Sequence, residues 1–174
     1  MHILFTRPEV ESIYSAKKFI KLGHRVSVFP ILNIIKKKII DINFTNYNSV
    51  IFTSSNAVLC LDQNIQTNIR CFCVGEVTAA QAKQKGFNNI ITAGGNYLQL
   101  KETILNIADK SDGKFLYIRG EDVAHNLEAD LKKNGYSIDS VINYTSSLNP
   151  DFDQKTLTIL KDQSIDLILS LIHI

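Results

Sequence analysis

The segment KFLYIRGEDVAHNLEADLKKNGYSIDSVINY, residues 114–144, joins two apolar runs through a stretch of helical composition. The first run, 114–120, stops at an arginine and a glycine, and the second run covers 137–145. Between them, Gly135 fits the end of a helix predicted at 121–135. A strand, a helix and a strand in this order form a β-α-β unit, which places both strands parallel in one sheet. The segment therefore predicts a parallel sheet that is covered by helices.

The same alternation extends over most of the chain. A polar connection with one short helix is expected at 146–163, and a last strand begins at 164. Ser54 or Ser55 fits the N-cap of the helix that follows the strand at 49–54. Strands that alternate with helices predict an α/β protein with helices on both faces of parallel sheets. The remaining predicted strands are 2–6, 25–30, 70–75 and 88–93, and the remaining predicted helices are 8–23, 55–63, 76–86 and 97–110.

The N-terminal stretch MHILFTRPEVESIYSAKKFIKLGHRVSVFP, residues 1–30, follows the plan of 114–144. With a few inserted residues, NSVIFTSSNAV (48–58) also corresponds to IDLILSLIHI (165–174). Self-similarity of this kind indicates a duplication and predicts two lobes. The second copy of the repeated sequence stops before the first copy does. At an offset of 112 residues, Leu4 coincides with Leu116, Arg7 with Arg119, Glu9 with Glu121 and Gly23 with Gly135.

Composition and charge exclude several classes of protein. The formal charge of +2 is too small to argue for nucleic acid or a membrane surface. No apolar run approaches the length that spans a bilayer. The N-terminus has a short apolar run broken by Arg7, Pro8 and Glu9, which does not fit a signal peptide. A cytoplasmic protein with an apolar core is expected.

The chemical motifs of cofactor and metal sites are missing from the sequence. Cys71 and Cys73 alternate on one face of a predicted strand, which favours buried thiols, and Cys60 has no matching pair at metal-ligand spacing. The chain has no phosphate-binding G-x-x-x-x-G-K-[ST] motif, and AGGN (93–96) is not a G-x-G-x-x-G turn. The sequence therefore predicts neither a metal nor a cofactor. Lys36, Lys37 and Lys38 are interpreted as a solvated connector or a guarded edge strand, rather than as an anion site.

Six motifs occur in the order and spacing of a known family: ILFTRPE (3–9), LGHRVSVFPILNI (22–34), YNSVIFTSSNAV (47–58), CFCVGEVTAAQAKQKGF (71–87), LYIRGE (116–121) and VINYTS (141–146). Together they resemble uroporphyrinogen-III synthase. The resemblance implies two flavodoxin-like parallel-sheet lobes that are joined by a two-strand linker and face an open cleft. Residues 1–33 plus 148–174 would form a discontinuous, incomplete lobe, and 34–147 a complete middle lobe that includes the linker strands. The family continues with a stretch that this sequence lacks.

The resemblance also implies a reaction and a site. The expected substrate is hydroxymethylbilane, a linear tetrapyrrole, which closes to uroporphyrinogen III with inversion of ring D and loss of water. Tyr144 matches a tyrosine that the family places at the cleft, where its phenol would act as a general acid; the alternative is a half-buried strand tyrosine. Because the substrate is a polycarboxylate, the turns after the strands are expected to bind it through backbone N–H groups and hydroxyls. These turns contain Thr53, Ser54, Ser55, Asn56, Gly75, Thr78, Arg119 and Gly120.

Alternatives remain open at several positions. Arg7 and Arg119 either bind carboxylates or pair with an acid such as Glu9 or Glu121 and hold the turn. Thr78 is either a ligand contact or a helix-capping or helix-surface threonine. For the whole chain, the alternatives are a truncated, inactive family member and a non-catalytic α/β anion-binding module. A monomer that needs no cofactor and binds neither nucleic acid nor membrane is expected.

Overall fold

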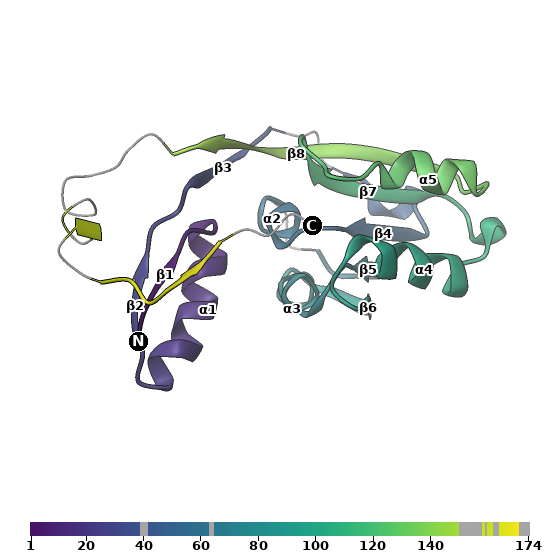
Figure 1. Ribbon diagram of the computed structural model, residues 1–174. Helices are drawn as coiled ribbons and strands as arrows, with labels where there is room; N and C mark the ends of the chain where they lie inside the picture. Colours follow the sequence, from purple (N-terminus) through teal and green to yellow (C-terminus); the bar gives the residue numbers. More distant parts are fainter. Residues whose placement is uncertain (39–41, 63–64, 150–157, 159, 162–163, 171–174) are drawn as a thin grey trace. The chain divides into compact units, whose positions relative to one another are not determined.

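The computed structural model describes residues 1–38, 42–62, 65–149, 158, 160–161 and 164–170. The chain divides into two compact units, which we call unit 1 and unit 2. Unit 1 comprises Met1–Ile35 and Ser146–Ile174, and unit 2 comprises Lys36–Thr145. The fold is α/β, with parallel strands in both units (Figure 1).

The main sheet has six strands in the order β3-β8-β7-β4-β5-β6. The pairs β4–β5, β4–β7, β5–β6 and β7–β8 are all parallel, so the carboxyl ends of these five strands lie at one edge of the sheet. The strands are β3 (Leu32–Lys36), β4 (Ser49–Phe52), β5 (Thr67–Cys73), β6 (Phe87–Thr92), β7 (Phe115–Gly120) and β8 (Ile138–Leu148).

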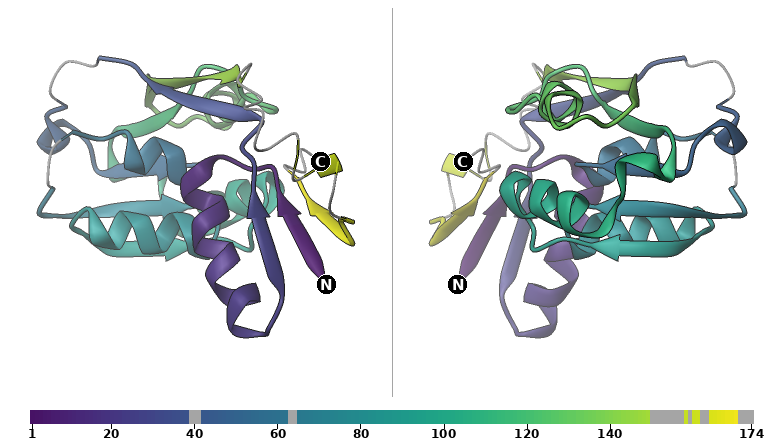
Figure 2. Two further views of the ribbon diagram at one scale, coloured as in Figure 1. Left: turned by 90° about the vertical axis from the view of Figure 1, so that its left-hand side faces the viewer. Right: turned by 90° about the vertical axis from the view of Figure 1, so that its right-hand side faces the viewer.

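Helices cover both faces of the sheet in unit 2 (Figures 1 and 2). The strands are apolar on both faces, as buried parallel strands require: Val50 and Phe52 pack on one side, and Ile51 packs on the other. Helices α2 (Ser55–Leu59) and α3 (Glu76–Gln84) lie on the first face, and α4 (Tyr97–Ile107) and α5 (Leu127–Lys133) on the second. Two short 3-10 turns, η1 (Phe44–Asn46) and η2 (Lys110–Asp112), complete the elements of this unit.

Unit 1 contains a three-stranded sheet of order β2-β1-β9. Strand β1 (His2–Phe5) pairs in parallel with β2 (Arg25–Val28) and with β9 (Leu167–Leu169), so distant parts of the sequence meet in one sheet. Helix α1 (Glu9–Lys21) packs Ala16 against the strands. The short helix predicted within 146–163 falls largely outside the described residues.

The two copies predicted from the offset of 112 residues have the same topology. In unit 1 the order is β2-β1-β9, and the matching strands of unit 2 have the order β8-β7-β4. Gly23 and Gly135 follow the helices of the two copies, and both have a positive φ. The duplication therefore extends from the sequence pattern to strand order.

Two predicted helices were too long: the helix expected at 55–63 ends at Leu59, where Cys60 is the C-cap. The helix expected at 121–135 begins only at Leu127, because Asn126 is its N-cap and accepts a hydrogen bond from the Ala129 backbone N–H at 3.0 Å. The preceding residues form a loop at the carboxyl end of β7 instead. The correction adds this loop to the edge at which the strands of unit 2 end.

The cysteines are buried, and two lysines of the run 36–38 form ion pairs. Cys60, Cys71 and Cys73 are buried free thiols, as predicted. The Cys71 and Cys73 sulfurs lie 3.7 Å apart, and this hydrogen bond together with burial raises the pKa of the Cys71 thiol. Lys36 ends β3 and pairs with Asp62, whereas Lys37 pairs with Glu121 at 2.9 Å.

Within the described residues, no helix has the length and apolar character needed to cross a membrane.

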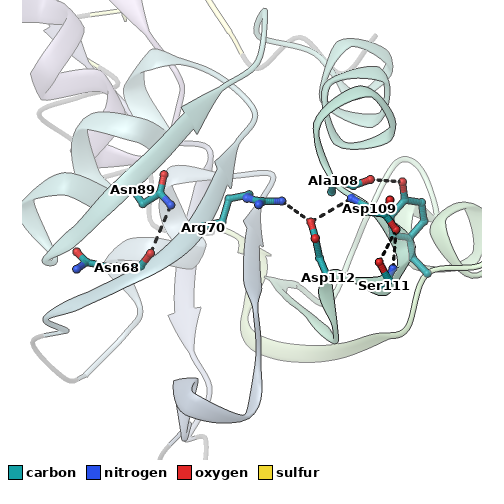
Figure 3. Close-up of polar contacts among 8 residues, drawn as sticks. Asn68, Arg70, Asn89, Ala108, Asp109, Ser111 and Asp112 are labelled. Atoms are coloured by element: carbon teal, nitrogen blue, oxygen red, sulfur yellow. Dashed lines mark hydrogen bonds and ion pairs between the residues drawn. The ribbon is translucent and has the colours of Figure 1, made fainter.

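An ion-pair network fixes the connection between α4 and β7 (Figure 3). The Arg70 guanidinium on β5 lies 2.8 Å from the Asp112 carboxylate, which also accepts a hydrogen bond from the Asp109 backbone N–H at 3.0 Å. The Asp109 carboxylate in turn accepts hydrogen bonds from the N–H and the hydroxyl of Ser111. These contacts form a capping box on η2 and tie it to the sheet.

The hydrogen bond from Arg70 lowers the pKa of Asp112. A carboxyl whose folded-state pKa is lowered stabilises the fold above its unfolded pKa of about 3.9, and this contribution disappears as the pH falls through the folded pKa. We expect Asp112→Asn to lower the Tm at pH 7 and to match the wild type near pH 2, as measured by circular dichroism. Glu102→Gln, an exposed change on α4, is the control. An equal Tm difference at both pH values would contradict the prediction.

Candidate functional site

The edge at which the strands of unit 2 end collects most of the residues predicted for the site. Thr53 to Asn56 follow β4, Val74 and Gly75 follow β5, and Gly94 to Asn96 follow β6. Gly120 ends β7, and the loop 121–126 comes next. Open α/β sheets bind their ligands at the carboxyl ends of the strands. We call this group of turns the strand-end edge.

The start of α3 presents backbone N–H donors. Gly75 is the N-cap and provides no side-chain cap, and the first helical bond runs from the Ala79 N–H to the Gly75 carbonyl at 3.0 Å. The N–H groups of the first turn precede this bond and have no acceptor within the helix, an arrangement that suits an anion. A Cβ on Gly75 would lie 3.2 Å from the Cα of Gly95, so glycine allows the turns after β5 and β6 to approach closely. Thr78 is only 4% exposed, which leaves the backbone as the main donor here.

The start of α2 separates two accessible residues from two buried ones. Ser54 is the N-cap, and its hydroxyl accepts a hydrogen bond from the Asn56 N–H at 3.1 Å. Ser55 and Asn56 are buried, whereas Thr53 and Ser54 are half-buried. The open choice between Ser54 and Ser55 as cap is thereby decided for Ser54. Thr53 and Ser54 are the side chains of this turn that a ligand can reach.

Tyr144 owes its position to a bulge in β8. Arg119 pairs with Ile142 and Gly120 pairs with Tyr144, so β8 has one extra residue, Asn143, between these pairs. A bulge of this kind re-aims a side chain. The Tyr144 ring lies against Gly120, where an added Cβ would approach the ring carbon Cζ to 2.7 Å. Gly120 thus leaves the space that the phenol occupies at the strand-end edge.

Asn143 links the bulge to α2. Its side chain is fully buried, and its Nδ2 donates a hydrogen bond to the Ala57 carbonyl at 2.7 Å. Because Ala57 belongs to the helix that Ser54 caps, this contact connects the turn after β4 with the strand that carries Tyr144. This buried hydrogen bond therefore adds to the strand pairing β4–β7–β8 in linking the two parts of the site.

The two arginines bind the backbone near their own turns. Arg119 donates from Nε to the Ser140 hydroxyl at 2.9 Å, and from Nη1 to the carbonyls of Gly120 at 2.8 Å and Glu121 at 3.0 Å. Lys37, rather than Arg119, is the main cause that lowers the pKa of the Glu121 carboxyl. Arg7, in unit 1, donates from Nε to the Ser170 carbonyl at 3.0 Å. These contacts favour a turn-holding role for both arginines.

Tyr117 is a residue that the sequence reasoning missed. It lies on β7 and is 2% exposed, and its hydroxyl lies 3.0 Å from the Thr53 hydroxyl. Burial raises the pKa of the Tyr117 phenol, so the group stays protonated at neutral pH. In the sequence Tyr117 is one of several apolar strand residues, and no local signal points to Thr53.

A second aromatic group lies on the α4 and α5 side of the sheet. The Tyr97 ring stacks on His125 with centroids 4.3 Å apart. The Tyr97 hydroxyl donates to the Asp130 carboxylate, which also accepts from Lys101 at 2.7 Å. Burial is the largest cause that raises the pKa of Tyr97. Among the described residues, no group of three or more His, Cys, Asp or Glu side chains could hold a metal ion.

These observations define a class: an α/β protein that presents backbone N–H groups, hydroxyls and a tyrosine phenol at the carboxyl ends of parallel strands. Residues 15–170 match the family model described as "Uroporphyrinogen-III synthase HemD". The chain belongs to the uroporphyrinogen-III synthase family, a family of enzymes of tetrapyrrole and heme biosynthesis. The curated proteins contain no match to this chain.

Solved structures agree with this family at the level of the fold. The uroporphyrinogen-III synthetase of Helicobacter pylori 26695 is 18% identical, with a TM-score of 0.59 over 91% of this chain and 67% of that chain. A mutant uroporphyrinogen III synthase of the extremely thermophilic bacterium Thermus thermophilus is 13% identical, with a TM-score of 0.53 over 98% of this chain and 72% of that chain. This chain thus aligns with about two thirds to three quarters of each neighbour's length.

Proposed function

We propose that this chain acts on hydroxymethylbilane as a uroporphyrinogen-III synthase, and that the strand-end edge of unit 2 provides substrate contacts. Membership of the uroporphyrinogen-III synthase family supports this reaction. The observation that carries the assignment of residues is the bulge in β8, which holds the Tyr144 phenol over Gly120 at the edge where the open helix start of α3 also lies. Anion donors and a proton donor are therefore present in one unit.

The carboxylates of the substrate would bind to the turns after β4 and β5. The first-turn N–H groups of α3 lie at the positive end of the helix dipole, which favours an anion. The hydroxyls of Thr53 and Ser54 add donors on the neighbouring turn. Arg7 and Arg119 would shape the ends of their strands instead of binding carboxylates, because their guanidinium groups contact backbone carbonyls.

Tyr144 would assist the departure of the terminal hydroxyl. The bond between the hydroxymethyl carbon and its oxygen breaks with the electron pair on oxygen, and the phenol of Tyr144 donates a proton to give water. A proton that leaves the pyrrole nitrogen balances this step and yields the electrophilic azafulvene. Attack by the substituted carbon of ring D forms a spiro intermediate, whose rearrangement inverts that ring. The protein must also hold the folded substrate, because the free substrate closes spontaneously without inversion.

The direct test is a product analysis. The chain is mixed with enzymatically generated hydroxymethylbilane, and the products are oxidised and separated by HPLC. We expect the type III isomer to form faster than the type I isomer forms in a protein-free control. If only isomer I appears, at the spontaneous rate, the catalytic proposal is wrong. Substrate binding without isomer III would then favour a non-catalytic anion-binding module.

A further inference from the structure

The Thr53–Tyr117 hydrogen bond links the core of unit 2 to the strand-end edge. The Tyr117 ring packs among buried apolar residues on the α4 and α5 face, and its hydroxyl lies 3.0 Å from the Thr53 Oγ1. A buried phenol needs a hydrogen-bond partner. Tyr136, in the same cluster, meets this need by donating to the Ala108 carbonyl at 2.8 Å. Tyr117 instead uses a half-buried side chain in the turn that we assign to carboxylate binding.

The chemistry of the two hydroxyls favours one direction for this hydrogen bond. A phenol is a stronger donor than an aliphatic alcohol, and burial keeps Tyr117 protonated. Either hydroxyl can donate, and the stronger acidity of the phenol favours Tyr117 as the donor and Thr53 as the acceptor. The Thr53 hydroxyl then keeps its own proton for another acceptor. Because threonine is β-branched, its χ1 has few allowed values, and the hydrogen bond to Tyr117 favours one of them.

We infer that Tyr117 is a positioning residue, which holds the Thr53 hydroxyl as a donor to a carboxylate of the tetrapyrrole substrate. This inference rests on the proposed function and deepens it, because it assigns a role to a core tyrosine in substrate recognition. Tyr117 also interacts electrostatically with Arg119 and Tyr144. Thr53 directly follows Phe52, which pairs with Ile118 two residues before the end of β7, so the hydrogen bond lies near that end of the strand. Tyr117 acts through Thr53 and does not itself touch the substrate.

The test is a double-mutant cycle with Tyr117→Phe, Thr53→Val and both changes together. A hydrogen bond to a charged group is worth enough to change affinity by about tenfold or more. We expect each single variant to raise the KM for hydroxymethylbilane by about tenfold with kcat changed less than about threefold. Because Thr53→Val removes the donor and Tyr117→Phe removes the group that positions it, both changes act on the same substrate contact, and the double variant should resemble Thr53→Val alone. Independent effects that multiply, or an unchanged KM in Tyr117→Phe, would overturn the inference.

Tyr136→Phe is the matched control, because it removes the other buried phenol hydroxyl of the same cluster. It should lower the Tm about as much as Tyr117→Phe while leaving KM unchanged. If Tyr117→Phe does not fold, the inference is tested by comparing substrate binding by Thr53→Val and Thr53→Ser. The serine variant retains the hydroxyl and should recover the binding that the valine variant loses. Equal binding by these two variants would contradict the inference.

A second measurement separates this inference from the proposed function. Binding of uroporphyrin III, the oxidised form of the expected product, is followed by quenching of its fluorescence. A wild-type chain that yields only isomer I refutes the proposed catalysis. If Tyr117→Phe and Thr53→Val still weaken uroporphyrin binding in that case, the positioning role stands. If the wild type yields isomer III and both variants bind uroporphyrin as the wild type does, the positioning role is wrong and the function stands.

Discussion

Replacing Tyr144 by phenylalanine is expected to lower the rate of uroporphyrinogen III formation by about a hundredfold, the lower end of what a general acid contributes. The change removes the hydroxyl and keeps the ring that packs over Gly120 and against the α2 and α3 face of the sheet. The fold should therefore persist. Isomer I should continue to form at the spontaneous rate, so the ratio of isomer III to isomer I falls. HPLC of the oxidised products measures both isomers in one experiment.

Tyr47→Phe is the control for Tyr144→Phe. Tyr47 packs on the same apolar cluster, but it precedes β4 and lies at the opposite edge of the sheet, where its hydroxyl donates to Asp139 at 3.0 Å. Loss of this hydroxyl should affect stability and leave the isomer ratio unchanged. A Tyr144→Phe variant with wild-type rate would exclude the phenol as the proton donor. A loss of activity of the same size in both variants would point to general destabilisation.

Local sequence signals were sufficient to predict the elements that position the site. The segment 114–144 indicated a β-α-β unit. As expected, β7 and β8 are parallel strands, and α5 connects them. The turns with Thr53, Ser54 and Gly75 were placed at the ends of strands, and this placement follows from the parallel arrangement alone. Apolar periodicity and N-cap residues decide such features within a few residues of sequence.

Contacts that depend on strand register were not predictable. The Tyr117 hydroxyl meets Thr53 because β4 and β7 pair with Ile51 opposite Tyr117, and no single strand contains that information. The bulge at Asn143 was not predictable either, because the pattern of apolar and polar residues in β8 does not show where an extra residue is inserted. The backbone partners of Arg119 were not predictable either, because Arg119 bonds to a loop after β7 that the sequence pattern assigned to a helix.

The largest stability effect is expected from Gly86→Ala. Gly86 follows α3 with φ of +99°, a conformation that residues with a Cβ rarely adopt. An added Cβ would lie 1.5 Å from the Ile65 carbonyl oxygen, so the clash is with backbone rather than with a side chain that can rotate. Strain at this φ and overpacking cost about 1–3 kcal/mol each, and we expect a loss of about 4 kcal/mol in the free energy of unfolding. Hydrogen exchange of the β5 and β6 amides measures this loss within unit 2.

Gly95→Ala separates the two causes. Gly95 has φ of +105°, but an added Cβ there would meet nothing within 4 Å. This variant should lose only the conformational part, about 1–2 kcal/mol. The difference between the two losses in free energy of unfolding then gives the cost of displacing the backbone at Ile65. The Ile65 N–H donates to the Lys85 carbonyl at the end of α3, at 2.9 Å. Equal losses in both variants would mean that the backbone at Ile65 yields without cost, and that the close packing of α3 against the start of β5 contributes little to the stability of unit 2.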